Sequence, residues 1–257
     1  MTQPEQDGPA EREFRPVKSA DRTLDVLEAV AAGPASLSDL ARRLGIPKSS
    51  LHGLVRTLTD RGWVAPVDGG SRLRLGLRAL QVGSRFVDED EVVAHVRPSL
   101  DRLAAVTGET VQQARLDGDQ VVYIAKRDTS HPVRIISSIG TRLPAHATAL
   151  GKALLAADPG AGARLTGPLV ALTPHTLTEP AAVEADLALT RTRGYAIDDG
   201  EAAEGLRCFA VVVPAGRGVG APTDAISVSV PSFRLDDERE SRLVAALLDE
   251  QRRLGGP

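Results

Sequence analysis

Apolar residues recur every three or four positions in three successive segments of the N-terminal part of the chain, which is the spacing of amphipathic helices. The first segment begins at Ser19, a residue type that caps helices, and ends at Gly33-Pro34. A second helix begins at Ser36 or Ser38, and a third follows Pro47. The apolar residues expected to face the core are Leu24, Leu27 and Val30 in the first helix, Leu37, Leu40, Ala41 and Leu44 in the second, and Leu51, Leu54, Val55 and Leu58 in the third.

The second and third predicted helices, with a glycine-containing turn between them, cover about residues 37–58 and form the pattern of a helix-turn-helix. In that motif the second helix enters the major groove of DNA. The stretch RGWVAPVDGGSRLRLG at residues 61–76 predicts a β-hairpin around an Asp-Gly-Gly turn. Arg72 and Arg74 share one face of this hairpin, which is typical of a wing that contacts phosphates or the minor groove. We therefore predict a winged helix-turn-helix domain at residues 17–80.

In the rest of the chain, segments with strand-like alternation are interrupted by segments with helical spacing. A helix is expected at residues 91–108, and the Asp117-Gly118 pair predicts a hairpin turn between two strands. Strands are expected at 109–116, 119–127, 133–139, 207–214 and 223–230, and further helices at 146–157, 181–193 and 236–254. This irregular order favours an antiparallel sheet flanked by helices, in the α/β (α+β) fold class.

The composition is that of a soluble globular protein, with 42% hydrophobic and 25% charged residues in a chain of 257, long enough for one large or two modest domains. No apolar run reaches the ~18 residues of a membrane span, so no membrane partner is expected. The single cysteine, Cys208, excludes an internal disulfide and favours a cytoplasmic location. Residues 1–16 lack the layout of a secretory signal and are expected to form a disordered arm.

The net charge of −3 does not by itself suggest a nucleic-acid binder, but the charge is unevenly distributed. Residues 17–80 carry ten Lys and Arg against six Asp and Glu, whereas the remaining chain is acidic. This asymmetry is expected when only one end of a chain meets a polyanion. On the third helix no acid precedes Asp60, and Gly53 permits close approach of the backbone to DNA. The residues predicted to contact DNA are Lys48, Ser49, Ser50, His52, Arg56 and Thr57, with Arg72 and Arg74 of the wing.

Several motifs of the chain resemble those of one known family. In order they are SADRTLDVLEAVAAG, LSDLARRLGIPKSSLHGLVRTLTDRGWV, RLRLGLRALQVG, HATALGKALLA, LTPHTLTEP, RTRGYAIDDGEAAEGLRCFAVVV and AISVSVP. Together they resemble the IclR family of bacterial transcriptional regulators. The resemblance implies a winged helix-turn-helix domain (17–80), a linker helix (81–98) and a GAF-like effector-binding domain (99–257). A palindromic operator requires at least a homodimer, because each half-site receives one recognition helix, and the resemblance implies a homotetramer.

Three features of the larger domain predict a binding pocket for a small-molecule effector. Ser227 and Ser229 alternate along a predicted strand, so both hydroxyls point to one face. The helix that begins in HATALGK, after Pro144, presents backbone N–H groups that favour an anion. Ile135 and Leu143, in RIISSIGTRL, supply an apolar wall. A pocket of this composition suits a small organic acid.

The family resemblance also assigns effector contacts, and it implies small carboxylic or aromatic acids as effectors. By this resemblance the contact residues are Ala149, Leu150, Asp198, Cys208, Ser227 and Ser229. Asp198 repels an anion unless it is protonated, is bridged by water or accepts a hydrogen bond from a ligand hydroxyl. The sequence leaves these three possibilities open.

Enzymatic and cofactor-dependent functions have less support in the sequence. Cys208 lies in a predicted apolar strand, and no histidine is placed by the sequence to activate it. The chain has no G-x-S-x-G motif, and its five histidines lack the spacing of metal ligands. We therefore expect no enzyme activity, no metal and no cofactor. The main alternative to a DNA-binding regulator is a ligand-sensing interaction module whose polar helix face binds a protein.

Overall fold

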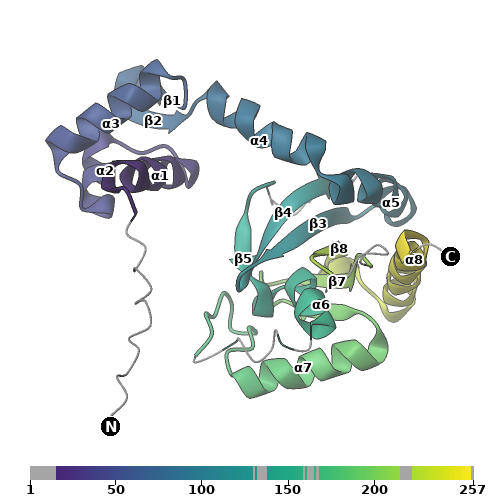
Figure 1. The fold of residues 1–257 in the computed structure, drawn as a ribbon. Helices are drawn as coiled ribbons and strands as arrows, with labels where there is room; N and C mark the ends of the chain where they lie inside the picture. Colours follow the sequence, from purple (N-terminus) through teal and green to yellow (C-terminus); the bar gives the residue numbers. More distant parts are fainter. Residues whose placement is uncertain are drawn as a thin grey trace, which may run out of the picture. The chain divides into compact units, whose positions relative to one another are not determined.

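The structure of the chain is a computed structural model. It divides into two compact units, Met1–Phe86 and Val87–Pro257 (Figure 1). No helix in the described part of the chain is long and apolar enough to cross a membrane. The described residues are 16–129, 131, 138–158, 160, 165, 168–214 and 222–255.

The N-terminal unit packs short helices against a two-stranded antiparallel sheet. Its elements are α1 (Lys18–Ala31), α2 (Leu37–Leu44), α3 (Lys48–Asp60), β1 (Val64–Val67), the 3-10 turn η1 (Asp68–Gly70) and β2 (Arg72–Leu75). Helices α2 and α3 form the predicted helix-turn-helix. In the predicted hairpin, Val64 lies opposite Leu75 and Val67 lies opposite Arg72. The winged helix-turn-helix fold is therefore confirmed.

The start and the buried face of α1 differ from the prediction. Helix α1 begins directly after Val17, which offers no side-chain cap, so Ser19 is not the capping residue. Leu24 is 59% exposed, whereas Val26 and Val30 are buried. This helix has apolar residues on two adjacent faces, so its own periodicity is ambiguous. Packing against α2 and β2 selects the face that is buried.

The sequence leaves Ser36 and Ser38 as alternatives for the start of α2, and the structure selects Ser36. The Ser36 hydroxyl oxygen accepts a hydrogen bond from the Asp39 N–H at 3.1 Å, and the hydroxyl donates to Asp39 Oδ2 at 2.7 Å. At the other end of α2, Gly45 has φ 63°, a left-handed conformation that suits glycine. These two local signals fix the ends of α2 and the short turn before α3.

We expect Ser36→Ala to lower the free energy of unfolding of the N-terminal unit by about 1 kcal/mol, because the first turn of α2 loses its cap. Urea unfolding followed by the fluorescence of Trp63, the only tryptophan of the chain, reports on this unit. Ser38→Ala, at an exposed position inside the same helix, is the matched control and should change the stability little. Equal stability of the two variants would contradict capping by Ser36.

The C-terminal unit is built on a sheet whose described strands run in the order β5-β4-β3-β8-β7-β6, with every pair antiparallel. The strands are β3 (Thr110–Asp117), β4 (Gln120–Arg127), β5 (Arg142–Pro144), β6 (Ala196–Asp199), β7 (Leu206–Val212) and β8 (Asp224–Pro231). The helical segments are α5 (Glu91–Thr107), η2 (Ala145–Ala147), α6 (Ala149–Ala157), α7 (Pro180–Arg193), η4 (Ser232–Arg234) and α8 (Asp237–Gly255). The predicted antiparallel sheet with flanking helices is confirmed.

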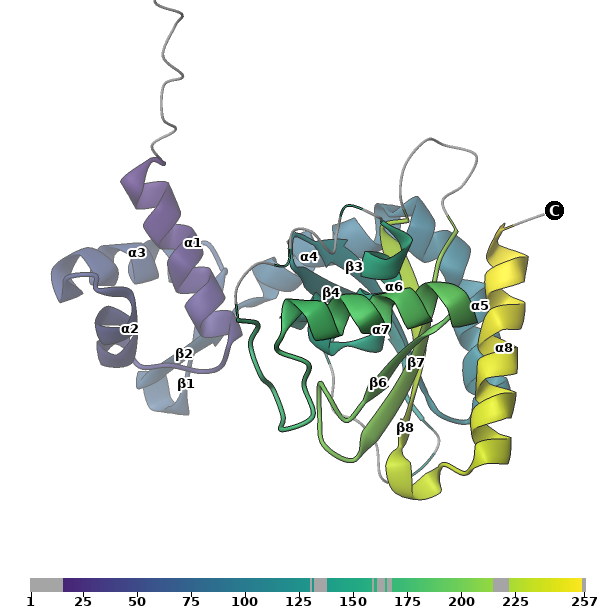
Figure 2. The ribbon, with the colours of Figure 1, turned by 90° about the horizontal axis from the view of Figure 1, so that it is seen from below.

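Two helical layers enclose this sheet, with α6 and α7 on one face and α5 and α8 on the other (Figure 2). Leu154 of α6 and Leu187 of α7 lie in one hydrophobic core. Leu100 of α5 and Leu247 of α8 lie in the second. Because successive side chains of a strand point to opposite faces, each strand contributes alternate residues to the two cores.

Residues 81–98 do not form the single linker helix that the sequence predicts. They comprise the end of α4 (Leu77–Glu89) and the start of α5, which are separated at Asp90. The Asp90 carboxylate accepts a hydrogen bond from the Val93 N–H at 2.9 Å and caps α5. It also accepts hydrogen bonds from Arg115 on β3, at 2.6 and 3.1 Å. The predicted limits of the linker and of the two domains stay predictions.

The β3–β4 hairpin forms as predicted, but its turn lies one residue further along the chain. Asp117 pairs with Gln120, so the turn residues are Gly118 and Asp119 rather than Asp117 and Gly118. Gly118 has φ 65°, which explains why a glycine stands at this position. The sequence correctly located the hairpin because a glycine that permits positive φ is a local signal.

Short elements and the segment before β5 were less accurately predicted. Strands β5 and β6, with three and four residues, are too short to show a periodicity and were not expected. The predicted helix at 146–157 begins at Ala149, after the 3-10 turn η2. Of the strand predicted at 133–139, residues 133–137 lie outside the described residues, and Ser138 and Ile139 lie in no strand.

Candidate nucleic-acid interface and effector pocket

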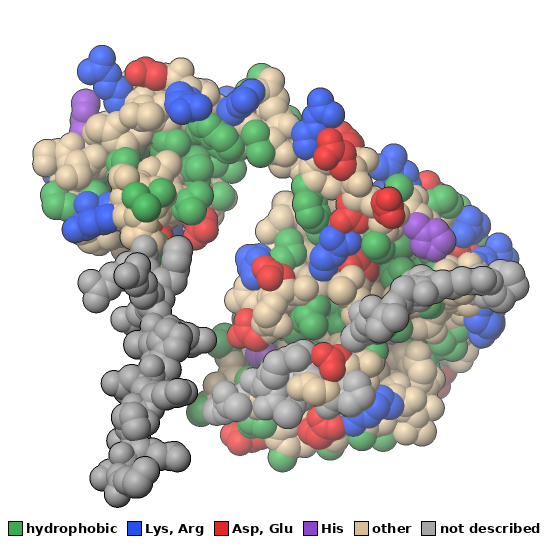
Figure 3. Space-filling view, viewed as in Figure 1, with side chains coloured by type: hydrophobic (Ala, Val, Ile, Leu, Met, Phe, Trp, Pro, Cys, Tyr) green, Lys and Arg blue, Asp and Glu red, His purple; other side chains and the backbone are tan. Residues whose placement is uncertain are grey.

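Helix α3 has one buried and one exposed face, and its polar residues lie on the exposed one. Leu51 and Leu58 are buried in the core of the N-terminal unit, and Leu54 and Val55 are half-buried. Figure 3 shows Lys and Arg side chains and a histidine on the surface of this unit. The predicted DNA contacts that the structure leaves exposed are Lys48, Ser49, Ser50, His52, Arg56, Thr57, Arg72 and Arg74.

Some of these exposed side chains already have contacts within the chain. The Thr57 hydroxyl donates to the Gly53 carbonyl at 3.0 Å, so its hydrogen is used within the helix. Arg56 lies 3.9 Å from Asp60, with both side chains mostly exposed. The Arg72 guanidinium donates to the Pro34 carbonyl. An exposed ion pair contributes little stability, so Arg56 can exchange Asp60 for a phosphate at low cost.

In the C-terminal unit, strand register places three of the predicted effector contacts in one row. Asp198 on β6 lies opposite Cys208 on β7, and Cys208 lies opposite Ser229 on β8. Ser227 is two residues earlier on β8 and points to the same face. This face is the one that α6 covers, because Cys208 packs against the core that contains Ala149 and its neighbours.

The remaining predicted pocket residues fall at different places. Ala149 and Leu150 begin α6 and are buried against this sheet face. Leu143 lies on β5, at the opposite edge of the sheet from Asp198, so the structure does not bring it into the row. Ile135 lies outside the described residues.

The start of α6 is held close to the preceding 3-10 turn. Thr148 caps the helix, because its hydroxyl oxygen accepts a hydrogen bond from the Gly151 N–H at 3.0 Å. A Cβ atom on Gly151 would lie 2.1 Å from the Ala145 carbonyl oxygen, so only glycine fits there. The N–H groups of Ala149 and Leu150 precede this capped position, and they are the ones that the predicted anion would meet.

Asp198 also organises the loop that follows β6. Its Oδ1 accepts hydrogen bonds from the Glu201 N–H at 2.7 Å and the Ala202 N–H at 3.2 Å. The hydroxyls of Thr173 and Thr176 donate to backbone carbonyls of the same loop, at 2.7 Å each. Asp198 and the two threonines therefore hold the loop after β6 in place.

Burial controls the protonation of the two titratable groups in the row. It raises the pKa of Asp198 to about 6, and the nearby Glu201 carboxylate adds to this effect. Hydrogen bonds from two N–H groups and the charge of Lys152 act in the opposite direction. Burial and the neighbouring Asp198 also raise the pKa of the Cys208 thiol well above its ordinary value. A thiol held neutral in this way is a poor nucleophile.

We expect Asp198→Asn to remove a pH dependence of stability. Asparagine Oδ1 can accept the same two N–H bonds, but it carries no charge. Because the pKa of Asp198 is raised from 3.8 to about 6 in the folded chain, the wild type loses stability as pH rises from about 4 to about 6. The stability of the variant relative to wild type should therefore increase over this range, by up to about 3 kcal/mol.

Urea unfolding at a series of pH values, followed by circular dichroism, measures this difference. Asp199→Asn, at the exposed next position of β6, is the matched control. If the difference in the free energy of unfolding between Asp198→Asn and wild type stays constant from pH 4 to pH 7, burial does not raise the pKa of Asp198.

Lys152 was not predicted as a structural residue, although it is only 1% exposed in the middle of α6. Its ammonium group donates to Asp186 Oδ2 of α7 at 2.8 Å, to the Ile197 carbonyl of β6 at 2.9 Å and to Glu201 Oε1. One charged group thus connects α6, α7 and the loop after β6. The signal was present, because a lysine within the otherwise apolar ALGKALLAA must find charged partners if that helix is buried.

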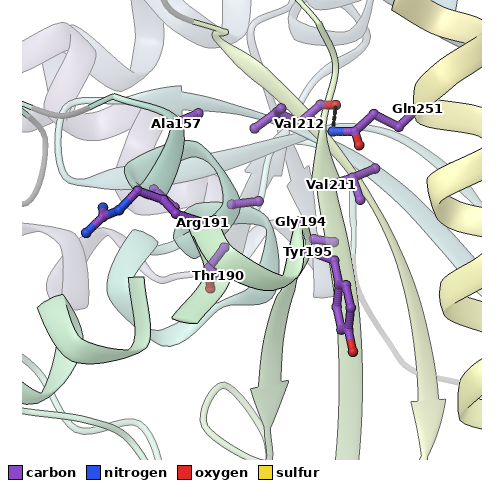
Figure 4. A pocket seen from close by; sticks show the side chains of 11 residues that line it. Ala157, Thr190, Arg191, Gly194, Tyr195, Val211, Val212 and Gln251 are labelled. Carbon is purple, nitrogen blue, oxygen red and sulfur yellow. Dashed lines mark hydrogen bonds between the residues drawn. The ribbon is translucent and has the colours of Figure 1, made fainter. Parts of the chain in front are cut away.

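A separate cavity of about 140 Å³ lies at the other end of α6 (Figure 4). Ala157, Thr190, Tyr195 and Val212 are among its lining residues, and Gln251 donates a hydrogen bond to the Val212 carbonyl at 3.1 Å. It contains none of the predicted effector contacts. Its volume is below the roughly 300–1,000 Å³ of most ligand pockets, so we assign it no ligand.

A winged helix-turn-helix with an exposed face of hydrogen-bond donors is typical of a DNA-binding transcriptional regulator. Two family models match the chain. One describes the IclR helix-turn-helix domain and matches residues 19–68, and the other describes the bacterial transcriptional regulator IclR C-terminal region and matches residues 84–254. The chain therefore belongs to the IclR family, and it is a regulator rather than an enzyme.

Named relatives support this assignment. The HTH-type transcriptional regulator BhcR of Paracoccus denitrificans is 37% identical over 93% of this chain and 86% of its own length. The transcriptional repressor IclR of Escherichia coli is 36% identical over 90% of this chain and 86% of its own length.

Solved structures of IclR regulators share the fold. An IclR transcriptional regulator from Alicyclobacillus acidocaldarius superposes with a TM-score of 0.80, at 27% identity, over 93% of this chain and 98% of its own. An IclR homologue from Microbacterium hydrocarbonoxydans, crystallised in complex with 4-hydroxybenzoate, superposes with a TM-score of 0.74, at 24% identity, over 91% of this chain and 97% of its own.

Proposed function

We propose that this regulator binds double-stranded operator DNA through α3 and the β1–β2 wing, and that a small organic acid in the pocket of the C-terminal unit changes its affinity for DNA. The observation that carries the DNA-binding role is the exposed face of α3, which has donors along its length and no acid before Asp60. Lys48, Ser49, Ser50, His52 and Arg56 offer hydrogen-bond donors to phosphates and base edges. Arg72 and Arg74 approach flanking phosphates from the wing.

We propose that the chain acts in the cytoplasm as a homodimer or homotetramer on a palindromic or nearly palindromic operator. One recognition helix reads one half-site, so a two-fold operator requires two copies of the chain. Effector binding then shifts the population between arrangements that fit the operator and arrangements that do not. A coupling free energy of about 1–3 kcal/mol changes operator affinity about 5–150-fold.

The row of Asp198, Cys208 and Ser229, together with Ser227 and the start of α6, is the proposed effector site. Buried hydroxyls and the backbone N–H groups at a helix start are donors that suit a carboxylate. The complex of a structurally similar IclR homologue with 4-hydroxybenzoate supports an organic acid as the ligand class. Because the pKa of Asp198 is raised to about 6, its protonated form is available to a bound acid near that pH.

Fluorescence anisotropy of labelled DNA tests the proposed function. The purified chain is titrated onto duplexes from its own upstream intergenic region and onto scrambled duplexes, at several salt concentrations. We expect a preference for the native sequence and a steep loss of affinity with salt, because phosphate contacts release counterions. Small carboxylic and aromatic acids are then added to the preformed complex. Equal affinity for native and scrambled DNA at every salt concentration would favour a protein partner for the α3 face.

A further inference from the structure

Four polar side chains of β3 and β8 lie next to one another on the sheet face that α6 covers. In register, Thr110 lies opposite Ser229, and Gln112 lies opposite Ser227. All four residues are at most 3% exposed. The next residues of both strands on this face are alanines, so the polar block is confined to one end of the two strands.

Two hydroxyls of this block have no hydrogen-bond partner among the described residues. Ser229 donates to Gln112 Oε1 at 3.2 Å, but Thr110 Oγ1 and Ser227 Oγ are buried and unpaired. Native proteins contain few such groups, because a buried hydroxyl without a partner lowers stability. Thr110 and Ser227 occupy diagonal positions, with Cα atoms roughly 7–8 Å apart, so they do not satisfy each other. Both donors remain available to a bound molecule.

Ionisable groups lie on either side of the polar block on the same sheet face. Lys126 on β4 lies opposite Gln112, and its ammonium group is paired with Asp128 Oδ1 at 2.6 Å. Asp198 on β6 lies two strands beyond β8, or about 10 Å. The buried carboxyl group at β6 gives the pocket a direction, because an acid points its carboxylate away from Asp198 and toward the unpaired hydroxyls of Thr110 and Ser227.

We propose that Thr110 and Ser227 bind the carboxylate of the effector, and that the effector is a hydroxy acid whose hydroxyl is remote from its carboxylate. This inference rests on the proposed effector site and extends it to Thr110. The two carboxylate oxygens accept hydrogen bonds of about 2.7 Å, one from each hydroxyl. At the other end of the ligand, its hydroxyl donates to Asp198. A neutral hydroxyl avoids the repulsion that a second carboxylate would meet at Asp198.

Thermal unfolding without any ligand tests whether the two hydroxyls are unpaired. We expect the Tm of Thr110→Val and of Ser227→Ala to stay equal to that of wild type or to rise, because each substitution removes an unsatisfied buried group. The matched controls are Thr190→Val and Ser99→Ala, whose buried hydroxyls accept hydrogen bonds from arginines. Their Tm should fall by about 2–4 °C. A fall of the same size for Thr110→Val would overturn the proposal.

Calorimetric titration of the full chain tests the ligand chemistry, with the sodium salts of 4-hydroxybenzoate, benzoate and glycolate as probes. We expect 4-hydroxybenzoate to bind most tightly, because benzoate lacks the hydroxyl and glycolate is too short to reach from β3 to Asp198. Thr110→Val should weaken the binding of 4-hydroxybenzoate and of benzoate alike, by roughly tenfold or more, because both acids lose a hydrogen bond to the carboxylate. Thr110→Ser, which keeps the hydroxyl, should retain the wild-type affinity.

Wild-type affinity in Thr110→Val would overturn the role of Thr110, and failure of all three acids to bind would overturn the assigned ligand class. Operator binding is measured on the same samples. A wild-type chain that binds its operator while these tests fail leaves the regulator function in place and removes only this inference. A wild-type chain that does not discriminate operator DNA counts against the proposed function itself.

Discussion

Replacing Lys152 by methionine will lower the Tm of the C-terminal unit by roughly 10 °C. The ammonium group is 1% exposed and contacts Asp186, Glu201 and the Ile197 carbonyl. Methionine fills a similar volume, but it leaves the Glu201 carboxylate without its cation and leaves Asp186 with only its 3.4 Å contact to Arg193. Removing one partner of a buried ion pair costs about 3–5 kcal/mol, and each kcal/mol corresponds to about 2–4 °C in a unit of this size.

Thermal unfolding followed by circular dichroism measures the effect of Lys152→Met. Arg142→Met is the control, because its ion pair with Asp117 is 2.7 Å long but about half exposed on both sides. We expect it to change the stability by less than about 1 kcal/mol. The double variant Lys152→Met/Glu201→Gln should recover part of the loss, since it removes the charge of Glu201 that Lys152 balances in the wild type. If Lys152→Met unfolds at the same temperature as Arg142→Met and the wild type, Lys152 does not hold α6, α7 and the β6 loop together.

Arg56→Ala will weaken operator binding by about 5–150-fold, the range expected when a side chain that contacts a base or phosphate is removed. Arg56 is exposed on the face of α3 opposite Leu51 and Leu58, and its contact with Asp60 is a weak surface ion pair. The substitution leaves the buried face of α3 unchanged, so the stability of the N-terminal unit should stay close to that of wild type.

Anisotropy titrations at several salt concentrations distinguish two ways in which Arg56 can act. If Arg56 contacts a phosphate, Arg56→Ala weakens binding to native and scrambled DNA alike. It also lowers the salt dependence of the affinity by about one released ion. If it contacts a base, the loss is confined to the native sequence. Arg242→Ala is a matched control, because Arg242 is an exposed arginine on α8 with an acid one helical turn away. An equal loss of operator affinity in the two variants would show that Arg56 does not contact DNA.

Local sequence signals account for most of the N-terminal unit. Ser36 caps α2 through its own neighbour Asp39, and Gly45 ends the helix because it adopts a positive φ. The interactions that fix these ends lie within a few residues of each other, so the sequence contains them. The exposed face of α3 was also predictable, since burying one apolar stripe turns the remaining residues outward. Leu24 is the exception, because α1 has two apolar faces and only its neighbours select one.

The candidate pocket depends on contacts between strands that are distant in sequence. Ser227 and Ser229 were placed on one face by alternation alone, but their neighbours across the sheet depend on strand register. Thr110 and Gln112 are more than a hundred residues away in sequence, and the pairing of β3 with β8 brings them together. Leu143 was expected in the pocket wall, yet β5 pairs with β4 at the opposite edge from Asp198.

The sequence by itself determined the helix-turn-helix, its wing and the acid-free face of α3, because caps, turns and periodicity act over a few residues. Its motifs also identified the family. The tertiary structure alone decided that Lys152 is buried among Asp186, Glu201 and a β6 carbonyl. It also decided that Thr110 lies diagonal to Ser227 and that neither hydroxyl has a partner among the described residues. These properties arise because strands that are distant in sequence pair in antiparallel order and because α6 packs on the sheet that they form. No local sequence pattern encodes the strand order or the packing of α6.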